Sequence, residues 1–75
     1  MTEVDAIIAT IFQCSADDLK DEDTPETIKA WDSMAHIILL SALEEEFSIS
    51  FSETEMAAIK TVGDIRQQVA AKRGS

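Results

Sequence analysis

The fold of this chain is decided by residues 32–47, which read DSMAHIILLSALEEEF. Apolar side chains recur in this segment every three or four residues, as they do along one face of an α-helix. Either Asp32 or Ser33 can cap the start of this helix, which we expect to run to about Glu46. At roughly 100° per residue, the stripe that faces the core is predicted to hold five residues: His36, Ile37, Leu40, Leu43 and Phe47.

Two large apolar residues of the same helix fall outside that stripe. Met34 and Ile38 are expected to point away from the core, beside Ser41 and Glu45. Large apolar side chains one turn apart on a polar face indicate a docking patch for another protein. The alternative is that they are two scattered surface residues, which are common in soluble proteins.

Three further helices are predicted around this one. The first covers residues 3–14, and the third is short, running from the capping box that begins at Ser52 to about Ala58. The fourth begins at Thr61. Residues 15–32 lack helical periodicity and are crowded with acids, so they are expected to form a long connecting loop, held by Leu19 and Ile28.

The sequence thus predicts an all-α fold, a small four-helix bundle with a long first loop and a short third helix. We expect one domain over residues 1–75, because a chain of 75 residues builds a single core. Fourteen of the fifteen acids precede residue 60, whereas four of the six bases follow residue 59. The basic C-terminal segment should pack back against the acidic part, or fray at residues 70–75.

Composition excludes several classes of function. A two-domain enzyme with an interdomain cleft needs a longer chain, and 45% hydrophobic residues is too many for a disordered acidic tail. A net charge of −9 opposes binding to nucleic acid or to an anionic membrane, and it favours basic protein partners. No apolar run is long enough to span a membrane. We expect a cytoplasmic monomer.

Few residues carry catalytic chemistry. The chain has one His, one Cys, no glycine-rich phosphate loop and no pair of ligands at zinc spacing. His36 is expected to be a packed, hydrogen-bonded structural residue, and Cys14 a buried small hydrophobe. No window of the acidic loop has the ligand pattern of a calcium-binding EF-hand. The residues therefore indicate neither an enzyme nor a metal site.

Ser33 differs from these residues because of where it lies. The start of a helix carries unpaired N–H groups and a positive dipole end, which favour a bound or attached phosphate. A serine at this position is most often just a cap. No His or Lys is placed to activate Ser33 as a nucleophile, so its modification would require another enzyme.

Four motifs follow one another at set distances: DSM at 32–34, LEEEF at 43–47, ISF at 49–51 and IKTVGD at 59–64. This ordered set resembles the acyl carrier protein family along nearly the whole chain. The resemblance implies that Ser33 is the attachment point of 4′-phosphopantetheine, which a separate phosphopantetheinyl transferase takes from coenzyme A. The thiol of that arm carries an acyl group as a thioester. Asp32 matches the acidic residue that assists the transferase, and the carrier itself catalyses nothing.

The chain also departs from the family pattern. Ala30 stands where the family typically has Gly, and Trp31 resembles free-standing carriers outside core fatty-acid synthesis, including D-alanyl carriers. Ala35 and Ile38 replace acids of the fatty-acid carriers. We therefore expect partner enzymes with basic or apolar docking surfaces to contact five residues: Trp31, Met34, Ala35, Ile38 and Glu45.

These departures favour a specialised lipid, glycolipid or secondary-metabolite pathway, served by acyl-loading and acyl-transferring enzymes. An aminoacyl carrier, D-alanyl or peptidyl, remains an alternative. An alternative from a different class is an unmodified acidic protein-interaction module, which the charge alone would permit.

Overall fold

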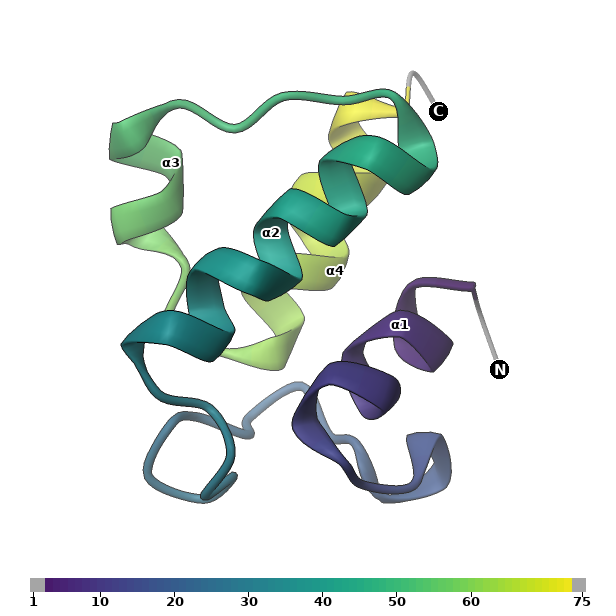
Figure 1. Cartoon of the computed structure of the whole chain (residues 1–75), viewed down its shortest axis with the longest axis vertical. Helices are drawn as coiled ribbons and strands as arrows, with labels where there is room; N and C mark the ends of the chain where they lie inside the picture. Colours follow the sequence, from purple (N-terminus) through teal and green to yellow (C-terminus); the bar gives the residue numbers. More distant parts are fainter. Residues whose placement is uncertain (1–2, 74–75) are drawn as a thin grey trace.

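The computed structural model describes residues 3–73. Within that range the chain forms four α-helices and one 3₁₀ turn, and no strand (Figure 1). The predicted all-α bundle, with its long first loop and short third helix, is confirmed. The elements are α1 (Glu3–Phe12), η1 (Ala16–Asp18), α2 (Ser33–Phe47), α3 (Glu53–Ala58) and α4 (Val62–Lys72).

The first helix ends two residues earlier than predicted. Gln13 adopts the left-handed conformation, with φ of 56°, and the Cys14 N–H donates to the Ala9 carbonyl oxygen at 3.0 Å. The Gln13 N–H donates to the Thr10 carbonyl oxygen. These two bonds make a Schellman turn, which satisfies the last carbonyls of a helix and turns the chain away from its axis. The long loop begins directly after this turn.

One hydrophobic core lies between α1, α2 and α4. α1 packs against both of the other helices, and loop residues Leu19 and Trp31 close the core from the end where α2 begins. Ile28 is partly buried against the same core, as expected for a loop anchor. The completely buried side chains are Ile8, Leu39, Leu40, Leu43, Val62, Ile65 and Val69.

The buried face of α2 is turned relative to the predicted stripe. Ile37 was expected in the core, but 59% of it is exposed, whereas Leu39, outside the predicted stripe, is completely buried. His36 and Phe47, also expected in the core stripe, are half-buried. The buried face is rotated because α2 contacts α1 as well as the rest of the bundle, so the buried arc of the helix extends toward Leu39. The angular count fixed the spacing of the stripe but not its centre.

The long loop is held against the start of α4. The N–H groups of Val62 and Gly63 donate to the carbonyl oxygens of Asp23 and Asp21, each at 3.0 Å. These N–H groups have no partner within their own helix, so the loop caps α4. Gly63 permits this approach, because a Cβ there would lie 3.1 Å from the Asp21 Cβ. The loop that leads to Ser33 is thereby fixed to the bundle.

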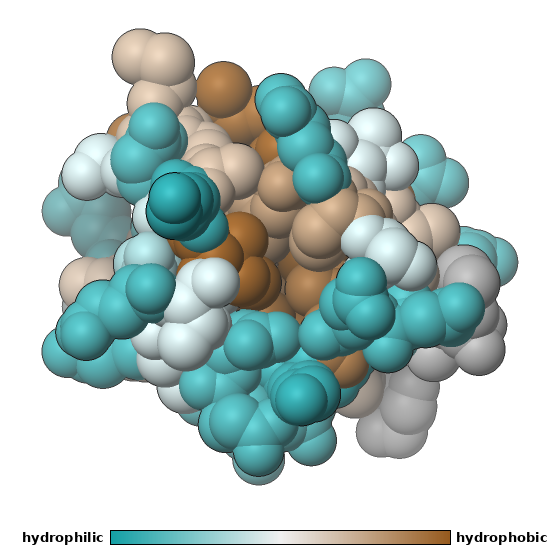
Figure 2. Space-filling model, turned by 90° about the horizontal axis from the view of Figure 1, so that it is seen from below, coloured by the Kyte–Doolittle hydropathy of each residue, from teal (hydrophilic) through white to brown (hydrophobic). Residues whose placement is uncertain are grey.

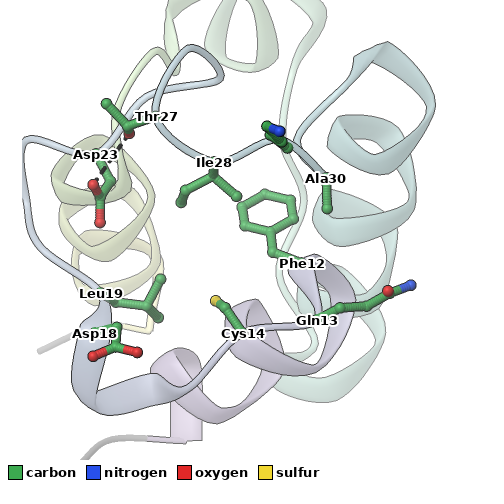
Figure 3. A pocket seen from close by; sticks show the side chains of 10 residues that line it. Phe12, Gln13, Cys14, Asp18, Leu19, Asp23, Thr27, Ile28 and Ala30 are labelled. Atoms are coloured by element: carbon green, nitrogen blue, oxygen red, sulfur yellow. Dashed lines mark hydrogen bonds between the residues drawn. The ribbon is translucent and has the colours of Figure 1, made fainter.

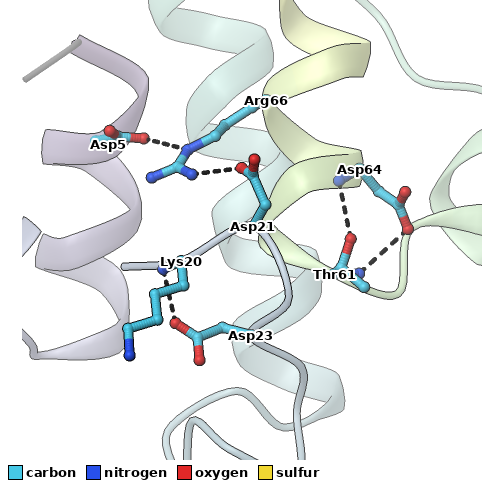
Figure 4. Close-up of polar contacts among 7 residues, drawn as sticks. All are labelled: Asp5, Lys20, Asp21, Asp23, Thr61, Asp64 and Arg66. Carbon is cyan, nitrogen blue, oxygen red and sulfur yellow. Dashed lines mark hydrogen bonds and ion pairs between the residues drawn. The ribbon is translucent and has the colours of Figure 1, made fainter. Parts of the chain in front are cut away.

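Basic residues of α4 pair with acids elsewhere, as predicted. The Arg66 Nε donates to Asp5 of α1 at 2.8 Å, and its Nη1 donates to Asp21 of the loop (Figure 4). Lys72 forms an ion pair with Glu55 of α3 at 2.8 Å. Residues 70–72 are helical and residues 74–75 lie outside the described range, so fraying at 70–75 stays a prediction.

The described residues contain neither a membrane-spanning helix nor a metal-binding cluster. No helix between residues 3 and 73 is long and apolar enough to cross a membrane. Over the same residues, no group of three or more His, Cys, Asp and Glu side chains is placed to hold a metal ion.

Candidate functional site

Asp32, not Ser33, caps the N-terminus of α2. Asp32 has an extended backbone conformation, and its Oδ1 accepts a hydrogen bond from the Ala35 N–H at 2.8 Å. Its backbone oxygen accepts the first bond of the helix, from the His36 N–H at 2.9 Å. Ser33 is therefore the first residue inside the helix. Its side chain is exposed, and its hydroxyl makes no hydrogen bond to any of the residues the structure describes.

The surroundings of Ser33 suit an attached phosphate. Ser33 and Met34 contribute backbone N–H groups at the first turn of a 15-residue helix, where helical bonding leaves such groups without partners. The helix dipole adds a partial positive charge at the same end. Ser33 thus offers an exposed nucleophilic oxygen beside donors that can stabilise a negative charge.

His36 is not available as a base for Ser33. The Trp31 Nε1–H donates to the Nδ1 of His36 at 3.0 Å, and the other ring nitrogen lies 3.0 Å from the backbone oxygen of Met56. Both nitrogens are engaged in structural contacts, as the sequence led us to expect. His36 is therefore not placed to activate the serine hydroxyl.

Trp31 was expected on the surface that partners contact, and this placement is wrong. Only 3% of Trp31 is exposed, and its ring stacks on Phe12 of α1 with centroids 5.0 Å apart. The indole is buried because the loop turns inward just before α2 and closes the end of the core.

The outward face of α2 carries an apolar surface next to Ser33, which we call the apolar face and define as Met34, Ile37 and Ile38. Their exposed fractions are 71%, 59% and 48%, and they are the large apolar side chains that residues 3–73 leave exposed. The predicted outward orientation of Met34 and Ile38 is confirmed, and Ile37 joins them. Of the other expected contact residues, Glu45 is exposed and Ala35 is partly buried against the core.

Sequence reasoning missed Ile37 because the stripe was centred near Leu40. Centred on Leu43 and widened to include Leu39, the same angular count puts Ile37 about 120° from the core direction. The face of the molecule that contains the loop and the start of α2 has apolar surface in its middle, bordered by hydrophilic side chains (Figure 2).

A surface cavity of about 550 Å³ adjoins Ser33. Asp32 and Ser33 are among its lining residues, and the walls are mostly apolar. Its lining residues are Pro25, Trp31, Asp32, Ser33, His36 and Ile37. An attached group on Ser33 would therefore have both a polar end and an apolar wall within reach.

A second cavity, of about 420 Å³, lies under the loop and is lined in part by Cys14 (Figure 3). Cys14 was expected to be buried, but it is exposed because α1 ends at Phe12 and the chain turns away from the core. Partial loss of solvent, and then the charges of Asp18 and Asp23, raise the pKa of the Cys14 thiol. A raised pKa keeps the thiol protonated and makes it a poor nucleophile at neutral pH.

Comparison with known proteins identifies the class of this protein. Residues 2–69 match the family model described as the phosphopantetheine attachment site. The chain therefore belongs to this family of carrier domains: it is a carrier and not a catalyst, and 4′-phosphopantetheine is its covalent cofactor. As a carrier it interacts with a phosphopantetheinyl transferase and with acyl-handling enzymes.

Within that class the chain is a member of the acyl carrier protein family. Its structure is similar to that of a holo acyl carrier protein from Geobacter metallireducens, with a TM-score of 0.81 and 33% sequence identity. The similarity covers 96% of this chain and 86% of the other. No curated protein sequence matches the chain.

Proposed function

We propose that Ser33 is the attachment residue and that the protein presents a thioester-bound acyl group to its partner enzymes. The observation that carries this proposal is that Asp32, and not Ser33, caps the start of α2. Because Asp32 takes the capping bond to Ala35, the Ser33 hydroxyl is left exposed for reaction. When bound, the cofactor supplies a thiol that holds the cargo as a thioester.

The residues around Ser33 fit the cofactor. N–H groups of the first turn of α2 are placed to stabilise its phosphate, and the cavity beside Ser33 offers an apolar wall. Asp32 is proposed to assist the transferase, in addition to capping the helix. Removing its charge without removing the cap separates the two roles, as described in the Discussion.

Intact-mass measurement tests the attachment site. Wild-type protein incubated with coenzyme A, magnesium and a phosphopantetheinyl transferase should gain the mass of one phosphopantetheine group, and Ser33→Ala should gain none. Ser41→Ala is the matched control, because Ser41 is another exposed serine of α2 and should leave the reaction unchanged. A modified Ser33→Ala protein would contradict this assignment. Failure of the wild type with every transferase tested would favour an unmodified acidic interaction module.

The apolar face is proposed as the docking surface for these enzymes, together with Ala35 and Glu45. Apolar side chains this exposed, beside the attachment residue, favour recognition by burial of apolar area more than by charge. Basic partner surfaces are favoured in addition by the net charge of −9. We take the chain to act as a monomeric carrier domain in the cytoplasm.

Substitutions on the apolar face test this docking role. Met34→Glu or Ile38→Glu should weaken turnover by the transferase or by a partner enzyme, while helical content and melting stay nearly unchanged. The stability is retained because neither side chain faces the core. An unfolded variant would show that the outward placement is wrong, and unchanged turnover with every partner enzyme would show that this face is not the docking surface.

The cargo is proposed to be an acyl group of a specialised lipid, glycolipid or secondary-metabolite pathway, with an aminoacyl group as the alternative. The apolar face supports this choice, since fatty-acid carriers have acids at the positions of Ala35 and Ile38. Mass analysis of the arm isolated from native cells distinguishes the two, because an aminoacyl cargo contains an amine that a simple acyl chain lacks.

A further inference from the structure

Trp31 and His36 form a bridge across the attachment serine. With Asp32 as the N-cap, Trp31 precedes the cap and His36 is the fourth residue of the helix. Apolar residues at these two positions often pack together, and they fix the direction in which the chain enters the helix. Here the pair is also hydrogen-bonded, from Trp31 Nε1 to His36 Nδ1 at 3.0 Å, and the rings are nearly parallel at 16°. We call this pair the Trp–His staple.

The staple joins three parts of the fold beneath Ser33. The Trp31 ring stacks on Phe12 of α1, and the Nε2 of His36 lies 3.0 Å from the Met56 backbone oxygen in α3. α1 and α3 are therefore both connected to the turn that presents Ser33.

The two hydrogen bonds of His36 can form together only when its ring is neutral and carries its proton on Nε2. An indole Nε1–H can only donate, so the Nδ1 of His36 must be the unprotonated acceptor. The proton of a neutral imidazole then lies on Nε2, where it donates to the Met56 oxygen. A protonated imidazole donates from both nitrogens, so it cannot accept the bond from Trp31. That would leave the N–H of an indole that is 3% exposed without its partner.

We propose that Trp31 and His36 are positioning residues for the modification of Ser33, and that protonation of His36 opens the staple. This inference rests on Ser33 being the attachment residue. Neither side chain reacts; together they hold the turn at which the transferase meets the serine hydroxyl. The signal to which the staple responds is protonation of the His36 ring, which removes the acceptor that the indole N–H of Trp31 needs.

Two carboxylates are adjacent in sequence to residues of the staple or its contacts: Asp32 follows Trp31, and Glu55 precedes Met56. Asp32, at the start of α2, lines the same cavity as His36. On α3, Glu55 precedes Met56 and is ion-paired with Lys72 of α4. α1 contributes the uncharged ring of Phe12. Asp32 and Glu55 are therefore the other groups from which a pH response can arise. The control variant His36→Gln removes the titration of His36 and leaves both carboxylates unchanged.

A pH titration followed by NMR tests the staple itself, without any transferase. The chain has one Trp, so its indole N–H gives a single resonance. Between pH 8 and pH 5 this resonance should move together with the ring nitrogens of His36. In His36→Gln it should stay fixed, because the glutamine carbonyl accepts a hydrogen bond but does not titrate.

Three results would overturn the proton-sensitive staple. In the first, the imidazole of His36 becomes protonated while the indole resonance stays fixed. In the second, His36 remains neutral down to pH 5. A pH response that persists unchanged in His36→Gln would assign it to another group, and would also contradict the proposal.

Transferase kinetics on the whole chain test the positioning role. His36→Ala and Trp31→Phe should each lower kcat/KM for modification by about tenfold or more, since small misplacement of a reacting group is costly to rate. His36→Gln should restore most of the loss. Val69→Ala is the control for stability, because Val69 is completely buried in α4, away from Ser33. An equal loss of kcat/KM in Val69→Ala would show that the staple contributes only through the general stability of the fold.

These outcomes separate this inference from the proposed function. Failure of the wild-type protein to become modified would refute Ser33 as the attachment residue. The NMR titration would still test whether protonation of His36 opens the staple, because it needs no transferase. If the wild type is modified and His36→Ala and Trp31→Phe keep a normal kcat/KM, the positioning role of the staple is refuted. Ser33 then still stands as the attachment residue.

Discussion

At the scale of single residues, the start of α2 assigns different tasks to two adjacent side chains. Both Asp and Ser are common helix caps, and the sequence left the choice open. In the structure Asp32 makes the capping bond to the Ala35 N–H, and Ser33 follows as the first helical residue. A serine that capped the helix would have its oxygen occupied by a backbone donor, so the position of the cap decides which residue is free to react.

Asp32→Ala should destabilise the protein by about 1 kcal/mol, because the Ala35 N–H loses its capping partner. Urea unfolding followed by circular dichroism measures the change. Asp32→Asn should retain nearly the full stability, since Asn caps as well as Asp does. If Asp32 also assists the transferase, Asp32→Asn should still lower the modification rate of Ser33. Equal rates for Asp32→Asn and wild type would limit this residue to capping.

The exposed thiol of Cys14 should react slowly. Its pKa is raised, chiefly by partial burial, so less thiolate is present at a given pH than for an unhindered cysteine. Alkylation by iodoacetamide at pH 8 should be slower in the folded protein than in urea, and it should accelerate as the pH rises. Asp18→Asn removes one of the negative charges that raise the pKa and should speed the reaction. No acceleration in that variant would show that the Asp18 charge does not contribute, which would leave partial burial and the Asp23 charge as the causes.

At the scale of elements, the rotation of α2 decides both which residues enter the core and which form the proposed docking surface. The spacing of apolar residues was enough to predict the helix and its length. Whether Ile37 or Leu39 turns inward depends on the neighbouring helix α1, which a helical wheel does not contain. The same rotation that buries Leu39 places Ile37 beside Met34 and next to Ser33.

Paired substitutions in α2 test this rotation. Leu43→Ala should destabilise the protein by about 2–5 kcal/mol, because it empties a completely buried site. Ile37→Ala should cost less than about 1 kcal/mol, as expected for a mostly exposed side chain. Chemical denaturation of both variants gives the comparison. A large loss of stability in Ile37→Ala would instead support the stripe predicted from the sequence, in which Ile37 faces the core.

At the scale of the whole molecule, the uneven charge is organised by the fold. Arg66 and Lys72 of α4 pair with acids of α1, the loop and α3, so part of the negative charge is neutralised by ion pairs at the surface of the bundle. α2 has no basic residue and three acids in its last turn, and its first turns carry the apolar face. The surface around Ser33 is consequently more apolar than a net charge of −9 suggests.

Glu55→Gln tests the contribution of the ion pair between α3 and α4. The hydrogen bond from Lys72 lowers the pKa of Glu55 below its ordinary value of 4.5. A carboxyl whose pKa is lower in the folded state stabilises the protein above its ordinary value, and this contribution is lost as the pH falls through the lowered value. Wild type should therefore melt above Glu55→Gln at pH 7, and the difference should shrink below pH 4.5 and vanish in stronger acid.

Two features make this variant a clean test. Gln at the third helical position retains the hydrogen bond to the Ser52 N–H, so the capping box is preserved. Taking the difference between variants also cancels the general effect of acid on the other carboxylates. A difference in melting temperature that persists in strong acid would assign the effect to packing.

By itself the sequence determined the helices, the capping box of α3, the acidic loop and the candidate serine, because these features depend on residues close together in the chain. The spacing of DSM and the three later motifs was also sufficient to indicate the family. Tertiary structure alone decided that Trp31 is buried, that Ile37 is exposed, and that α4 is capped by the loop. The physical reason is that burial and long-range hydrogen bonds depend on which elements face one another. That arrangement is fixed only when α1, the loop and α4 pack around α2.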